Sequence, residues 1–134
     1  MNTRLLRKVA KHIAEEPKRF VMGAWILRKH GDSKIVEMEN VDGKEIWDFP
    51  KCGTAACING WGHILVNKEF RTEGAFISGA ELFDISVPQA ERLFRVIDWP
   101  EKFRNRFRRG KTPAARAKVA VARIEHFIKT KGAE

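Results

Sequence analysis

The sequence contains no tyrosine, and only two of its 134 residues are cysteines. Cys52 and Cys57 are too few and too closely spaced to form a disulfide framework, so we expect reduced thiols. The chain also lacks an apolar run of roughly 18 residues, as a membrane-spanning helix requires, and its first 20 residues lack the apolar centre of a signal peptide. These absences predict a soluble, cytoplasmic protein with no membrane partner.

Acidic residues are scarce at both ends of the chain. Lysine and arginine together number 26 against 17 acidic residues, which gives a formal net charge of +9. Residues 1–31 contain eight basic and two acidic side chains, and residues 100–134 contain eleven basic and three acidic side chains. Residues 32–99, in contrast, contain seven basic and twelve acidic side chains. An anionic partner, either a nucleic acid or an acidic protein, would therefore meet the two cationic ends.

Length and apolar content predict one domain over residues 1–134. Apolar residues at helical spacing, with capping residues before them, predict five to six helices, at residues 3 to about 13, 54–66, 78–83, 86 to about 96, 99–110 and 113–129. Residues 32–49 alternate around a turn at 40–43 and predict an antiparallel β-hairpin. Residues 20–27 form either a third strand or a buried extended segment. The predicted fold class is α+β, mainly helical, with a small hairpin or sheet.

The densest stretch of unusual residues lies at 52–63 and reads CGTAACINGWGH. Thr54 is the best N-cap for a helix in this stretch. Gly60 and Gly62 each cost a helix about 1 kcal/mol relative to alanine, so their presence indicates that neighbouring backbone packs very close. We therefore expect the helix at 54–66 to be the buried centre of the domain.

Cys52 is a candidate nucleophile because the backbone N–H groups at a helix start stabilise a thiolate. Such a site also needs a base, which the fold would supply from His12, His30 or His126. His63 is excluded, because eleven residues of continuous helix span about 16 Å. The alternative, which the composition favours, is that both cysteines are small buried apolar residues.

A metal site made of Cys52, Cys57 and His63 does not fit zinc spacing, which pairs ligands two to four residues apart and needs a second pair. On a helix, Cys57 and His63 also point about 240° apart. We therefore expect neither a metal nor a cofactor.

The stretch 78–96 contains a sequence with the spacing of a helix-turn-helix, AELFDISVPQAERLF. Asp84 departs from the motif, which prefers glycine at that position. The second helix also lies in the acidic third of the chain, whereas a helix that reads a DNA groove is rich in basic and amide side chains. An ordinary pair of packed helices is the favoured interpretation.

A basic surface is predicted from the last two helices and the turn between them. Its candidate nucleic-acid-binding residues are Lys102, Arg104, Arg106, Arg108, Arg109, Lys111, Arg116, Lys118 and Arg123. Arginine binds phosphate through two parallel hydrogen bonds, which suits this surface to a polyanion. A merely solvated helix face is the alternative.

Three stretches together carry a resemblance, CGTAACINGWG, ELFDISVPQAERLFRVIDWP and TPAARAKVAVARIEHFI. They resemble a family of small bacterial and phage-associated proteins of unknown function with a CGTxxCIxGW-type motif. The resemblance implies one mainly helical domain and carries no activity.

The leading functional hypothesis is a small, basic, non-enzymatic protein that binds nucleic acid or an acidic partner through its cationic ends. The alternatives are a cysteine-dependent hydrolase or transferase built on Cys52, and a helix-turn-helix DNA-binding protein.

Overall fold

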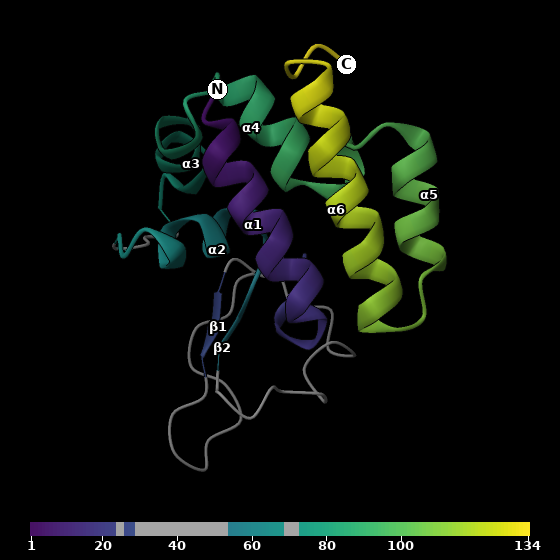
Figure 1. Ribbon diagram of the computed structural model, residues 1–134. Helices are drawn as coiled ribbons and strands as arrows, with labels where there is room; N and C mark the ends of the chain where they lie inside the picture. The colour runs from purple at the N-terminus through teal and green to yellow at the C-terminus, as the bar shows by residue number, and fades with distance from the viewer. Residues whose placement is uncertain (24–25, 29–53, 69–72) are drawn as a thin grey trace.

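The computed structural model describes residues 1–23, 26–28, 54–68 and 73–134, and these residues form a mainly helical fold (Figure 1). In chain order its elements are α1 (Thr3–Glu15), the 3₁₀ turn η1 (Pro17–Arg19), β1 (Ile26–Arg28), β2 (Thr54–Ala56), α2 (Ile58–Leu65), α3 (Ala75–Phe83), α4 (Val87–Phe94), the 3₁₀ turn η2 (Val96–Asp98), α5 (Glu101–Arg109) and α6 (Pro113–Lys129). The hairpin predicted at 32–49 lies outside the described residues and stays a prediction. Within the described ranges, no helix is long and apolar enough to cross a membrane.

Helices α1 and α6 lie side by side and antiparallel at the centre of the fold (Figure 1). Each presents a stripe of buried apolar residues, including Leu6, Val9 and Ile13 on α1 and Ala120 and Ile124 on α6. Helix α5 packs against α6, while α2 packs against α1 and α3. The first and last helices of the chain are thus neighbours in space.

Several helix starts follow the sequence prediction. The side chains of Asn2, Ser86 and Thr112 each accept a hydrogen bond from a backbone N–H of the first turn, which satisfies a donor that the helix itself leaves unpaired. Ser86 also forms a capping box with Gln89. The helix predicted at 99–110 begins later, because the chain makes the turn η2 first and α5 starts after Pro100 with no side-chain cap.

Three helix ends share one geometry without using glycine at its left-handed position. Asn67, Asp84 and Lys131 follow α2, α3 and α6 with φ angles of 54°, 51° and 52°. At each end the next residue donates its N–H to the carbonyl five residues back, for example Ile85 to Ala80 at 3.0 Å. This is the hydrogen bonding of a Schellman motif, in which a left-handed residue redirects the chain out of the helix.

The start of the central helix was predicted wrongly. Thr54 does not cap it, because Thr54–Ala56 is strand β2 and pairs antiparallel with β1. Cys57 is the N-cap instead, and its Sγ accepts a hydrogen bond from the backbone N–H of Gly60 at 3.4 Å. The prediction that this helix is buried is confirmed, since every residue from 58 to 63 is buried.

Glycines allow α2 and α3 to approach closely. A Cβ atom placed on Gly62 of α2 would lie 2.3 Å from the ring of Phe83 on α3. A Cβ atom placed on Gly79 of α3 would lie 2.5 Å from Oδ1 of Asn59 on α2. Real Cβ contacts are not this short, so the two helices meet only because these side chains are missing.

We expect Gly62→Ala to destabilise the protein, although alanine is the better helix former. Alanine would gain about 1 kcal/mol of helix propensity, but forcing a methyl group against the buried Phe83 ring costs about 1–3 kcal/mol. The expected net loss is up to about 2 kcal/mol in the free energy of unfolding, measured by urea denaturation. Combining Gly62→Ala with Phe83→Leu should make the two losses less than additive. Strict additivity would contradict the proposed clash.

Candidate functional site

Helix α5 sorts its residues into an apolar side and a cationic side. Phe103 and Phe107, one helical turn apart, are buried, which directs the remaining long side chains outward. Six cations of the predicted basic surface are exposed, namely Lys102, Arg106, Arg108, Arg109, Lys111 and, on α6, Lys118. Within the described part of the chain, none of these six takes part in an ion pair. Their charge is therefore available to an outside anion.

Two further arginines of the predicted surface are half-buried and hold the ends of α5. Arg104 donates from Nη1 to the carbonyl oxygen of Ile97 at 2.9 Å. Arg116 donates from Nε to the carbonyl oxygen of Gly110 at 3.0 Å, and its guanidinium lies 5.5 Å from the centre of the Phe107 ring. The Arg104 contact ties α5 to the turn η2 before it, and the Arg116 contacts fix the turn between α5 and α6.

A cleft of about 390 Å³ lies between the segment after α1 and the turn that joins α5 to α6. Its cations are Lys18 from the N-terminal segment and Arg108, Lys111 and Arg116 from the C-terminal segment. Phe20 and Phe107 contribute to its apolar lining and meet edge to face, with ring centres 6.4 Å apart. The two cationic ends of the sequence thus supply one cleft.

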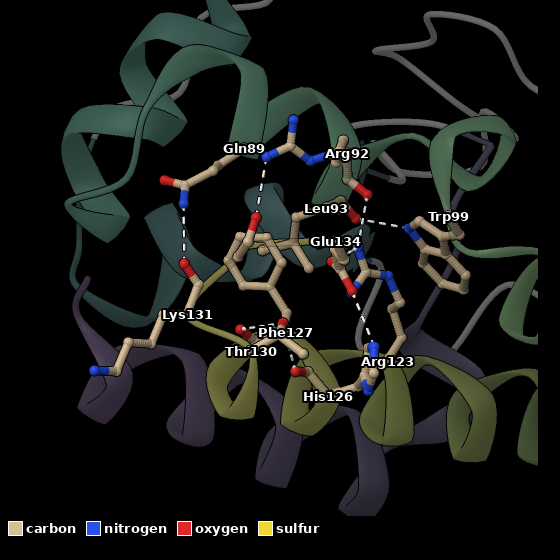
Figure 2. A network of polar contacts seen from close by, with 11 residues as sticks. Gln89, Arg92, Leu93, Trp99, Arg123, His126, Phe127, Thr130, Lys131 and Glu134 are labelled. Atoms are coloured by element: carbon tan, nitrogen blue, oxygen red, sulfur yellow. Dashed lines mark hydrogen bonds and ion pairs between the residues drawn. The ribbon is translucent and has the colours of Figure 1, made fainter.

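Arg123 does not belong to the exposed surface, which corrects the sequence prediction. Its side chain is 0% exposed. The guanidinium donates from Nη2 to the carbonyl oxygen of Arg92 at 3.0 Å and forms an ion pair with the carboxylate of Glu134 (Figure 2). A phosphate outside the protein cannot reach it in this arrangement. Burial is also the main reason why the pKa of Arg123 is lowered.

His126, one of the predicted bases, belongs to the same cluster (Figure 2). Its Nε2 lies 3.2 Å from Oε2 of Glu134. Its ring lies against Phe103, with ring centres 5.1 Å apart. The structure therefore gives His126 a carboxylate partner and not a position beside a described thiol.

The remaining candidates for catalysis have little support in the described residues. The His12 ring packs against the Trp61 ring at a tilt of 54°, with ring centres 4.1 Å apart, and burial together with the nearby charge of Arg19 lowers the pKa of His12. Cys52 and His30 lie outside the described residues. Cys57 is buried, which raises the pKa of its thiol to about 11. No cluster of metal-ligating side chains occurs in the ranges that the structure describes.

The predicted helix-turn-helix corresponds to α3 and α4. Asp84 adopts the left-handed conformation at the position where that motif prefers glycine. The polar side chains of α4, however, hold the end of the chain: Gln89 donates to the carbonyl oxygen of Lys131 and Arg92 to that of Gly132, both at 3.0 Å (Figure 2). Side chains that would read base edges are therefore occupied.

Two features of the site were missed in the sequence. Lys18 was not assigned to the basic surface, because nothing local shows that the end of α1 meets the start of α6. The burial of Arg123 did have a signal, since Arg123 lies three residues after Ala120 and four before Phe127, on the apolar stripe of α6. Helical spacing alone would have placed it inside.

A scan against protein-family models gives no match for this chain. Searches of curated proteins and of solved structures also return no similar protein. The resemblance to proteins with a CGTxxCIxGW-type motif therefore stays a prediction.

We expect Cys57 to be inert toward alkylation at neutral pH. With a pKa of about 11, about one thiol in ten thousand is ionised at pH 7, and burial also blocks access. In a Cys52→Ser variant, the remaining thiol should react with iodoacetamide at least about a hundredfold more slowly in the folded than in the urea-unfolded protein. Equal rates would contradict this burial. The complementary Cys57→Ser variant measures Cys52 by itself.

We also expect the stability of the protein to fall as the pH drops below about 6.5, the usual pKa of histidine. The folded state lowers the pKa of His12 and of His63, so the unfolded chain binds protons more readily in this range and protonation favours unfolding. His12→Phe keeps a ring on Trp61 and removes one of these two contributions. The loss of stability between pH 7.5 and pH 5.5, measured by urea denaturation, should be smaller in this variant. An unchanged loss would show that His12 makes no such contribution.

Proposed function

We propose that this protein binds the phosphate backbone of duplex nucleic acid through the cationic cleft and the adjoining face of α5. The observation that carries the proposal is the convergence of Lys18 with Arg108, Lys111 and Arg116 around one cleft. Cations that are about 90 residues apart in the sequence then act together on one polyanion, which is how phosphate contacts position a protein on nucleic acid.

The distribution of aromatic side chains favours a duplex over a single strand. Proteins that bind single strands without sequence preference usually stack bases on accessible aromatic rings. Among the described residues, the rings beside the cationic surface are Phe20, Phe103 and Phe107, and all three are buried. Contacts would therefore be made to phosphates and sugars, and the affinity would depend little on base sequence.

The predominance of arginine favours a phosphate-rich partner. A carboxylate-rich protein is the alternative partner to be tested. Arg106, Arg108 and Arg109 present planar guanidinium groups that match two phosphate oxygens at once. The enzyme hypothesis stays a prediction, because Cys52 lies outside the described residues. The helix-turn-helix hypothesis requires that the chain end first leave α4.

We expect the affinity for duplex DNA to fall steeply with salt, because each bound phosphate releases counterions. Lys111→Gln and Arg108→Gln should each weaken binding and lower the slope of log K against log salt by about 0.9. Fluorescence anisotropy with a labelled duplex between 50 and 200 mM salt, a range chosen for its large expected effect, measures both quantities.

Lys129→Gln is the matched control. The substitution removes the same charge, but Lys129 is exposed at the far end of α6, about 24 Å of helix from Pro113. The slope of log K against log salt should be the same for this variant as for the wild type. An equal effect of all three substitutions would show that binding depends on net charge and not on the cleft, which contradicts the proposal. A failure to bind DNA at low salt would also overturn it. Competition by polyglutamate as effective as that of DNA would instead indicate an acidic protein partner.

A further inference from the structure

The side chain of Glu134 reaches from the surface into the interior. The residue as a whole is exposed, whereas only 6% of its side-chain surface is exposed. One carboxylate oxygen pairs with Nη2 of Arg123 and the other lies 3.2 Å from Nε2 of His126 (Figure 2). The carboxylate thus lies in a pocket formed by the buried guanidinium of Arg123 and the half-buried imidazole of His126.

The pocket offers more donors than this carboxylate uses. The centres of the Phe103 and Phe127 rings lie 5.9 and 5.4 Å from the Arg123 guanidinium. Yet Nε and Nη1 of Arg123, which are buried, donate to no acceptor among the described residues. Buried donors without acceptors destabilise the folded protein, because they have lost their hydrogen bonds to water. An occupant with more oxygen atoms would satisfy more of them.

The segment that carries Glu134 is seated by specific contacts. Lys131 and Gly132 both have positive φ, 52° and 71°, which turns the chain back over α4. The positive φ of Gly132 disfavours any residue with a Cβ atom, and such an atom would also lie 2.5 Å from Nε2 of Gln89, so that the Gln89 side chain would have to move. Gln89 and Arg92 hold the segment only through backbone carbonyl oxygens, so the Glu134 carboxylate is its one charged anchor among the described contacts.

The charge of the cluster is incompletely balanced. Arg92 and Arg123 are near enough for their charges to repel, while Glu134 contributes a single negative charge. A dianion with four oxygen atoms would balance both the charge and the donors better than one carboxylate.

We propose that Arg123 and His126 form a binding site for a phosphate-type oxyanion, which the Glu134 side chain occupies in this structure. The ligand is inorganic phosphate or the phosphate group of a monoester. Its binding displaces Glu134, and the segment from Thr130 onward then leaves Gln89 and Arg92 of α4. This site is separate from the cationic cleft and does not depend on the proposed binding of nucleic acid.

The test compares the binding of inorganic phosphate to the wild-type protein and to Glu134→Ala by isothermal titration calorimetry at constant ionic strength. An internal occupant lowers the apparent affinity by the fraction of molecules whose site is filled, so Glu134→Ala should bind phosphate at least about tenfold more tightly. Glu125→Ala is the matched control. Glu125 lies on α6, next to His126, and its side chain is exposed. The substitution removes the same charge as Glu134→Ala, and the variant should bind phosphate like the wild type. Methyl phosphate, titrated in parallel, distinguishes a monoester ligand from the free ion.

Two further variants separate this site from general attraction to a basic protein. His126→Gln and Arg123→Met, each combined with Glu134→Ala, should abolish the gain in affinity, and the His126 ring resonances of Glu134→Ala should shift on adding phosphate. If Glu134→Ala is unfolded because Arg123 has lost its partner, phosphate should restore the fold at concentrations where chloride does not. The proposal is wrong if Glu134→Ala binds phosphate no better than Glu125→Ala, if the gain survives Arg123→Met, or if phosphate fails to refold an unfolded variant.

Discussion

The packing of α1 against α6 is the contact on which the rest of the described structure depends. Both helices are rich in cations, so bringing them together opposes like charges, but apart from Arg123 those charges lie on outer faces where salt screens them. The apolar stripes decide the outcome, because burying a side chain such as Leu6 or Ile124 contributes about 1.5–3 kcal/mol. As a result, two cationic segments far apart in sequence meet around one cleft.

The fold assigns its arginines to three different roles. Arg106, Arg108 and Arg109 project into solvent; Arg104 and Arg116 donate to backbone carbonyl oxygens and fix the ends of α5. Arg123 lies inside, where an isolated charge costs several kcal/mol unless a partner compensates it. That requirement fixes Glu134, and through Glu134 it fixes the last residues of the chain against α4. A single charged residue on an apolar stripe, Arg123, thereby determines where the residues after α6 lie.

Local signals made much of the helical fold predictable. Asn2, Ser86 and Thr112 cap helices as their side chains indicate, and Phe103 and Phe107 face inward as their spacing requires. Thr54 was misread as a cap because strand pairing with β1, a contact distant in sequence, outweighs a local preference. The positions of Lys18 and Glu134 depend on tertiary contacts, which no short stretch of sequence predicts. Helical spacing places Arg123 on the apolar stripe of α6 and so predicts its burial. The general rule that arginine is exposed led to the opposite prediction.

The pairing of α1 with α6 also has a consequence for synthesis on the ribosome. About 100 residues separate the two helices, so this contact has a high sequence separation, which slows folding. At roughly 5–20 residues per second, α1 is synthesised roughly 5–20 seconds before α6. During that interval Leu6, Val9 and Ile13 lack the helix that covers them, so the nascent chain exposes an apolar stripe within a positively charged segment. The stripe is fully covered only when α6 is complete.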